Sequence, residues 1–171
     1  TVAGTAIKIV CTANPTVMDV GGDVSTVTAK VMDVNGNVNK TWVGNVKFTI
    51  TGPGTWQDNT TTDQSIASVQ GIANIAVKST NIDGTIVIVS SGLSLQGSQS
   101  TIISQKGSAS KIIVNSSQLI VTANGSSTTV ITANITDRVG NLVPVNNLIE
   151  FRLAGEGSLT GTNPVSAVNG Q

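Results

Sequence analysis

The sequence predicts an all-β chain of antiparallel β-sandwich type, and three observations lead to this prediction. Val, Ile and Thr supply 63 of the 171 residues, whereas Leu supplies 7 and Glu only 2. β-branched side chains suit a pleated sheet better than a helix. Apolar and polar residues alternate with a period of two, as in Val46–Ile50. The alternating segments are short and are separated by Gly, Asn, Asp and Pro, which favours antiparallel strands over βαβ units.

The alternation predicts seven strands in the first 104 residues and four in the remainder. In residues 24–33, for example, Val27, Ala29 and Val31 face one way, and the residues between them face the other. Seven strands in about 100 residues is the size of an immunoglobulin-like sandwich. The expected strands lie near residues 5–12, 24–33, 43–51, 65–69, 72–79, 84–90 and 100–104, and then near 110–115, 118–122, 127–137 and 147–154.

An internal repeat indicates two copies of one unit. Thr28–Asp33 returns as Thr132–Asp137 at an offset of 104, and Val46–Ile50 returns as Ile149–Leu153 at an offset of 103, so that Phe48 matches Phe151. We therefore predict a first sandwich over residues 1–104, a short linker over 105–110 and a second sandwich over 111–171.

The second copy lacks counterparts of the expected strands 72–79 and 84–90. A sandwich without them would expose core side chains and strand edges. Three explanations are open: the chain is part of a longer protein, a neighbouring subunit supplies the strands by β-augmentation, or the second unit is a compact variant.

Composition excludes several classes of function. Nine basic and nine acidic residues balance to zero net charge, which is not the pattern of a nucleic-acid-binding protein. With no His and one Cys, the chain lacks the usual ligands for zinc, copper or haem. No apolar run approaches the roughly 20 residues that span a bilayer, so no membrane insertion is expected. The N-terminus does not resemble a signal peptide, which suggests a mature chain or an excised fragment.

No catalytic residue is predicted, and we expect no cofactor. The seven Asp residues lie beside turn-forming residues, where short carboxylates bond their own backbone. Cys11 shares a strand face with Ile7 and Ile9, and its match in the second copy is Val114. A position that accepts Cys or Val indicates a buried packing thiol, with an intermolecular disulfide as the alternative.

Three oxygen-bearing side chains at alternate positions, Asp33, Asn35 and Asn37, suggest a weak calcium site. Asp19 or Asp23 could complete such a site. The alternative is a plain hairpin turn, because Asn35-Gly36 is a common turn pair.

Two further features concern the surface. Trp42 has no aromatic match in the second copy and is a candidate interface or ligand residue, the alternative being a loop aromatic packed on its own sandwich. Five sequons are possible glycosylation sites, although a chain this rich in Asn, Ser and Thr contains sequons by chance. They are Asn39, Asn59, Asn115, Asn124 and Asn134.

Four segments carry a family resemblance: Ser25–Asn37, Val46–Gly54, Gly71–Thr80 and Gly84–Ser90. Together and in this order they resemble bacterial immunoglobulin-like domains of the invasin and intimin type, over residues 4–104 fully and 108–171 partially. The resemblance implies an extracellular spacer or adhesive module of the kind found in tandem stalks of adhesins, S-layer proteins and envelope-associated enzymes. The second copy departs from it with Asp137-Arg-Val-Gly-Asn141, and no lectin-like terminal domain is present.

We therefore expect a non-catalytic structural module of a cell-surface protein, such as an S-layer subunit, an adhesin stalk or an extracellular filament. Its expected partners are neighbouring immunoglobulin-like domains or subunits, with strand complementation as one mode, and glycans. The alternative is a carbohydrate- or receptor-binding accessory module of a secreted protein or enzyme, which Trp42 alone supports.

Overall fold

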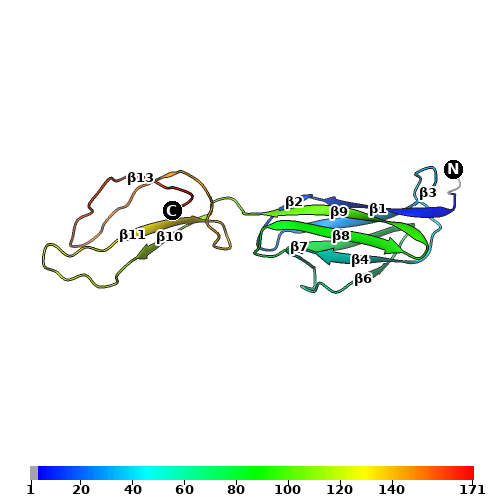
Figure 1. The fold of residues 1–171 in the computed structure, drawn as a ribbon, viewed down its shortest axis with the longest axis horizontal. Coiled ribbons are helices and arrows are strands. Elements are labelled where there is room, and N and C mark those ends of the chain that lie inside the picture. The colour runs from blue at the N-terminus through cyan, green and yellow to red at the C-terminus, as the bar shows by residue number, and fades with distance from the viewer. Residues whose placement is uncertain (1–3) are drawn as a thin grey trace. The chain divides into compact units, whose positions relative to one another are not determined.

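The structure is a computed structural model, and it describes residues 4–171. The chain divides into two compact units, Thr1–Gln105 and Lys106–Gln171, which we call unit 1 and unit 2. Every regular element in the described residues is a β-strand (Figure 1). The all-β prediction is therefore confirmed. Residues 4–171 contain no helix that is long and apolar enough to cross a membrane.

Unit 1 holds nine strands that form two packed layers (Figure 1). Their order is β5-β7-β3-β1-β9-β8-β4-β6, with β2 paired to β9. β1 and β9 share only the parallel pair Lys8 and Gln96, so the path folds over between them. The strands are β1 (Ala6–Asn14), β2 (Val17–Asp19), β3 (Val24–Asp33), β4 (Asn45–Thr51), β5 (Gly54–Trp56), β6 (Gln64–Ala67), β7 (Ile72–Ser79), β8 (Gly84–Gly92) and β9 (Leu95–Gln105).

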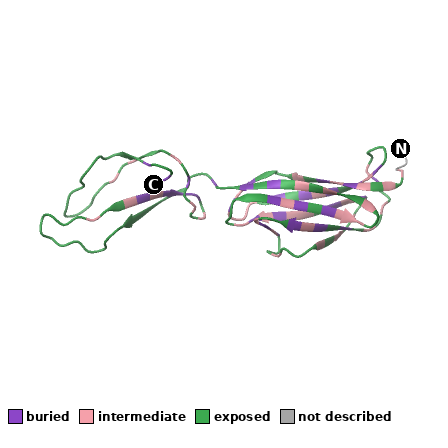
Figure 2. Cartoon of the chain, in the orientation of Figure 1, coloured by how far each residue is buried: buried purple, intermediate pink, exposed green. Residues whose placement is uncertain are grey.

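The core of unit 1 lies between these layers and follows directly from the alternation in the sequence. In β3 and β4 every second residue is buried, as the banding of the strands in Figure 2 shows. Burying β-branched and aromatic side chains is the main source of stability for such a sandwich. The largest fully buried side chains include Trp56, Phe48, Ile86, Ile88 and Ile102.

Unit 2 holds four strands in two separate pairs. β10 (Lys111–Ser116) pairs with β11 (Ile131–Thr136), and β12 (Leu148–Ile149) pairs with β13 (Val165–Ser166). Most of its residues are exposed, in contrast to unit 1 (Figure 2). Its buried residues are few: Ala133, Ile135, Thr136, Asp137, Val143, Ala167 and two glycines, Gly107 and Gly170.

Several predicted strand boundaries are wrong, and tertiary contacts explain the differences. Residues 118–122 form no strand, and only residues 131–136 of 127–137 and 148–149 of 147–154 are in strands. No neighbouring strand pairs with the remaining residues, so their backbone groups cannot form the hydrogen bonds of a β-ladder. In unit 1, β9 begins at Leu95 because the hairpin with β8 extends it. The short strands β2, β5 and β13 were not predicted.

The predicted match between Phe48 and Phe151 is wrong in its environment. Phe48 is fully buried in β4, whereas Phe151 is half-buried and lies in no strand. The second layer that covers Phe48 in unit 1 has no counterpart among residues 106–171. An aromatic ring needs atoms on both faces to be buried, and the strands of unit 2 form only two separate two-stranded sheets.

Candidate functional site

The Asp33 carboxylate at the end of β3 accepts four hydrogen bonds within unit 1. Oδ1 accepts the backbone N–H groups of Asn35 at 2.9 Å and Asn37 at 2.8 Å. Oδ2 accepts the N–H of Gly4 at 3.0 Å and the Asn37 side-chain amide at 3.3 Å. Asp33 is fully buried. The carboxylate therefore closes the turn after β3 and ties it to the segment before β1.

Unit 2 repeats this arrangement at Asp137. Its Oδ1 accepts the N–H groups of Val139 and Asn141, each at 3.0 Å. Its Oδ2 accepts the Asn141 side-chain amide at 3.1 Å and the N–H of Gly107 at 3.3 Å. The four donors correspond one to one with those of Asp33. Both aspartates thus hold the chain that enters the first strand of their unit.

These hydrogen bonds also set the ionisation of both groups. The N–H donors from Gly4 and Asn37 hold the pKa of Asp33 below its ordinary value. Burial acts to raise the pKa of Asp137, but the donors from Asn141, Val139 and Gly107 outweigh it and lower the pKa. A carboxylate stabilised in its charged form is a poor proton acceptor, so the geometry suits turn closure and not general base catalysis.

The calcium grouping proposed from sequence is wrong in one part. Asp23 precedes β3 and Asp33 ends it, so about ten residues at about 3.3 Å each separate them by roughly 30 Å. Asp19 accompanies Asp23, since its N–H donates to Asp23 Oδ2 at 3.1 Å. Neither can complete a site at Asp33. Calcium binding by Asp33, Asn35 and Asn37 stays a prediction, although Asn35 and Asn37 offer N–H groups to the carboxylate. Residues 4–171 hold no cluster of three or more His, Cys, Asp or Glu side chains placed for a metal ion.

Trp42 lies in the loop between β3 and β4 and is half-buried. It packs against the hydrophobic core, and a Cβ atom placed on Gly44 would lie 2.8 Å from its indole ring. The ring therefore covers Gly44 and does not stand free in solvent. Its neighbour Val43 is 92% exposed.

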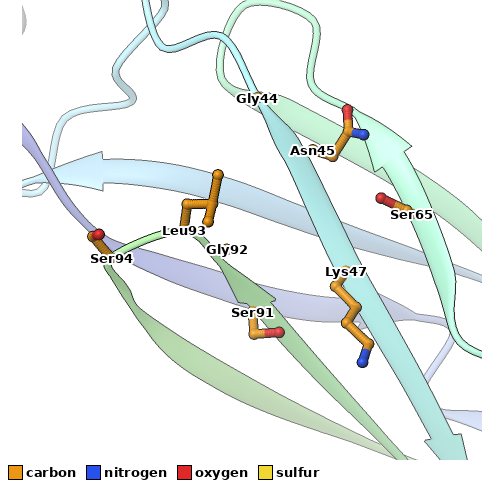
Figure 3. Close-up of a pocket in the computed structure, with 8 residues that line it drawn as sticks. All are labelled: Gly44, Asn45, Lys47, Ser65, Ser91, Gly92, Leu93 and Ser94. Carbon is orange, nitrogen blue, oxygen red and sulfur yellow. The ribbon is translucent and has the colours of Figure 1, made fainter.

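A shallow depression begins beside Gly44 (Figure 3), the residue that the Trp42 ring covers. Its one charged side chain, Lys47, forms a 2.6 Å ion pair with Asp63. Hydroxyls, an amide and an exposed Leu93 line the rest, which is chemistry that can contact a sugar. The lining residues are Gly44, Asn45, Lys47, Ser65, Ser91, Gly92, Leu93 and Ser94.

Cys11 is buried in β1 and is a free thiol. Burial raises the pKa of this thiol, and a hydrogen bond with the Ser90 side chain only partly offsets the effect. Because the thiolate is the reactive form, burial and the raised pKa both disfavour reaction at Cys11 in the folded unit.

The predicted sequons fall into different environments. The expectation of an accessible loop residue is wrong at Asn39, which is 6% exposed and donates from Nδ2 to the Gly4 carbonyl at 2.7 Å. Asn59, Asn115 and Asn124 are exposed, and Asn134 is half-buried. Glycosylation at these four stays a prediction.

Sequence reasoning missed two features of these sites. The depression was not predicted, because Ser65 is distant in sequence from Ser91 and Leu93 and only the pairing of β4 with β6 and β8 brings them together. The contact of Gly4 with Asp33 was also missed. A signal for it exists, because Gly4 returns as Gly107 at the offset of 103 that relates the two copies.

Comparisons with known proteins place this fold in context. Residues 9–101, just over half of the chain, match the family described as glycoside hydrolase family 2 C-terminal domain 5. No curated protein sequence matches the chain.

Solved structures share the fold. A glycosyl hydrolase family 2 member from Bacteroides cellulosilyticus matches 61% of this chain with a TM-score of 0.55 and 24% identity, over 15% of its own length. A β-glycosidase from Bacteroides vulgatus matches 59% of the chain with a TM-score of 0.53 and 16% identity, over 14% of its length. Invasin, a bacterial integrin-binding protein, matches 94% of the chain with a TM-score of 0.55 and 20% identity, over 32% of its length. The chain thus spans less than a third of each. The resemblance to an immunoglobulin-like domain of the invasin type is confirmed at the level of the fold.

Proposed function

Because the chain belongs to the family of glycoside hydrolase family 2 C-terminal domain 5, we propose that it is a non-catalytic structural module of a larger extracellular protein. The observation that carries this proposal is the role of the two buried acidic groups, Asp33 and Asp137. Asp33 and Asp137 are each held by four N–H donors of their own unit. Groups that could perform acid–base chemistry are instead committed to holding the fold.

The proposed mechanism is mechanical. Antiparallel ladders and a Val- and Ile-rich core make unit 1 a rigid body, and the Asp33 turn fastens the chain that enters it. Asp137 fastens the chain entering unit 2 in the same way, through Gly107. Because each entering segment is fixed to its own unit, a module built in this way serves as a spacer that holds neighbouring domains of a protein in place.

The fold shared with invasin, a bacterial integrin-binding protein, supports a location at the cell surface or in the extracellular space. A tandem stalk, an S-layer subunit and a filament subunit are the specific settings in which such a spacer would act. The partners in these settings are neighbouring immunoglobulin-like domains of the same protein.

The experiment measures glycoside turnover, glycan binding and thermal unfolding on the whole 171-residue chain. We expect no turnover of a panel of nitrophenyl glycosides and no saturable signal on a glycan array, together with a cooperative thermal transition of unit 1 followed by Trp fluorescence. Turnover abolished by Asp33→Asn, with the transition retained, would overturn the proposal.

A carbohydrate-binding accessory module is the second candidate, and the family match together with the depression beside Gly44 favours it. Here the hydroxyls of Ser65 and Ser91, which line the depression, would contact the glycan, and Trp42 would contact it from beside Gly44. This candidate predicts saturable glycan binding that Ser91→Ala weakens. Val43→Ala, which truncates an exposed neighbour, serves as the matched control and leaves binding unchanged. Ser91 is used in place of Trp42 because loss of the indole would also disturb the core.

A further inference from the structure

In unit 1, β7 covers one edge of β3. The matching edge of β11 in unit 2 pairs with no strand among the described residues. In unit 1, β7 runs antiparallel along β3, with Ala73 opposite Ala29, Ile75 opposite Val27 and Val77 opposite Ser25. In unit 2, β11 pairs only with β10 among the described residues.

The two edges are equivalent by three independent correspondences. First, the β10–β11 register repeats the β1–β3 register: Val114 lies opposite Ala133 as Cys11 lies opposite Ala29. Second, the aspartate turns that follow β3 and β11 have the same donors, as described above.

The third correspondence is the turn that leads onto the edge. The N–H of Val31 donates to the Gly71 carbonyl at 2.8 Å, and the N–H of Ile135 donates to the Gly170 carbonyl at 2.7 Å. Each turn is closed by reciprocal bonds, between Val69 and Ile72 and between Val168 and Gln171. The Gln171 side chain also donates to Asn134 Oδ1 at 3.2 Å. Gln171 thus occupies the place of Ile72, the first residue of β7.

The backbone of β11 beyond this point is ready for pairing. Backbone groups in an antiparallel strand point to alternate sides. Because the Ile135 N–H points to Gly170, away from β10, the N–H and C=O groups of Ala133 and Ile131 point the same way. In β3 the corresponding groups of Ala29 and Val27 bond to β7.

The face beside this edge is apolar and open. Ile112 is 55% exposed where its match Ile9 is 2% exposed, and Ile131 is 39% exposed where Val27 is fully buried. Exposed strand edges next to apolar faces are sites at which a further strand adds.

We propose that the β11 edge, Ile131–Asn134, is an acceptor site for one antiparallel strand with the chemistry of β7, donated from outside these 171 residues. The strand carries small apolar residues on one face, as Ala73, Ile75 and Val77 do, and polar or small residues between them. A second copy of this chain is not the donor, because its β7 is held between β3 and β5. The inference rests on the proposed structural role and names the interaction through which unit 2 is completed.

The test uses the whole chain and a capped peptide with the sequence of residues 73–79, Ala-Asn-Ile-Ala-Val-Lys-Ser, because Gln171 already fills the place of Ile72. We expect saturable binding, and hydrogen exchange of the Ile131 and Ala133 amides slowed by about tenfold or more as they become bonded.

N-methylated peptides provide the matched control. In β7 the odd-numbered residues bond to β3, as the Val31–Gly71 bond and the register show. Methylation at the Ala73 and Ile75 positions, which lie opposite Ala133 and Ile131, should therefore weaken binding by about tenfold or more, whereas methylation at the Asn74 and Ala76 positions should leave it within a fewfold.

Four outcomes would overturn the proposal: no binding, equal loss with both methylated peptides, binding that leaves the Ile131 and Ala133 amides unchanged, or a dimer of the free chain in which these amides are already protected. The last would assign the edge to a second copy. Glycoside turnover in a chain that still accepts the peptide would remove the proposed function and leave the acceptor site standing, so the two failures are distinguishable.

Discussion

Unit 1 and unit 2 share their local hydrogen-bonding devices and differ in how deeply they bury the side chains around them. The aspartate turn, the β1–β3 register and the glycine turn all recur in unit 2. The burial of the matching apolar side chains does not recur in unit 2. Trp56 is 2% exposed and its match Leu159 is 44% exposed, while Ile50 is 7% exposed and Leu153 is 50% exposed.

This difference separates two levels of structure. Turns and a single strand pair need only neighbouring backbone and a short polar side chain, so they form in either unit. Burial needs a second layer, which β8, β9 and β4 supply in unit 1. A two-stranded ladder alone has marginal stability in water, so we expect unit 2 to be the less stable of the two.

The largest expected effect tests burial directly. Phe48→Ala should lower the free energy of unfolding of unit 1 by about 3–5 kcal/mol, because it leaves a cavity in a closed core. Phe151→Ala removes a half-buried ring and should leave the unit 1 transition unchanged. Denaturant titrations followed by fluorescence report on unit 1, since both Trp42 and Trp56 lie there. Equal shifts in the two variants would break the comparison.

The glycine turns provide the next effect. Gly71 has a φ of 74°, and a Cβ atom there would lie 2.2 Å from the Asn39 carbonyl oxygen. Gly71→Ala should therefore destabilise unit 1 by more than the roughly 1–3 kcal/mol of backbone strain alone. Gly36→Ala is the matched control, because its φ is 80° but no atom lies within 4 Å of the added Cβ. Denaturation midpoints in the order wild type, Gly36→Ala, Gly71→Ala are expected.

The Gly170→Ala variant carries the same test into unit 2. A Cβ atom at Gly170 would lie 2.2 Å from the Val143 carbonyl oxygen, so the bond from the Ile135 N–H should be lost. Faster hydrogen exchange of the Ile135 amide is expected. Unchanged exchange would show that the two glycine turns are not equivalent.

Acid sensitivity should follow from the aspartate turn. The pKa of Asp33 is lower in the folded chain than its ordinary value of 3.8. The unfolded state therefore takes up the proton first, and the stabilisation is present above pH 3.8 and lost as pH falls through the lowered native pKa. Denaturation midpoints should decline with acid in the wild type, and less steeply in Asp33→Asn. Asp58→Asn, which removes an exposed carboxylate whose pKa is also lowered, should alter this decline less.

Exchanging a residue between matched positions of unit 1 and unit 2 should have the smallest effect. Cys11→Val installs the residue found at the matching position 114 and should change the free energy of unfolding by less than about 1.5 kcal/mol. In the wild type, a thiol reagent should label Cys11 slowly until unit 1 unfolds, because burial raises the pKa of the thiol. Rapid labelling of the native chain would contradict the packing role.

Sequence patterns determined the all-β class, the inward faces of β3 and β4, and the turn at Asp33 with its repeat at Asp137. These features depend on side-chain stiffness, period-two alternation and bonds spanning two to four residues, all of which are local. Only the tertiary structure decided that Asn39 is buried, that Asp19 and Asp23 lie far from Asp33, and that Phe151 has no cover where Phe48 has a complete layer. Such outcomes depend on which distant strands pack together, because burial is a property of two surfaces and a single segment of sequence describes only one of them.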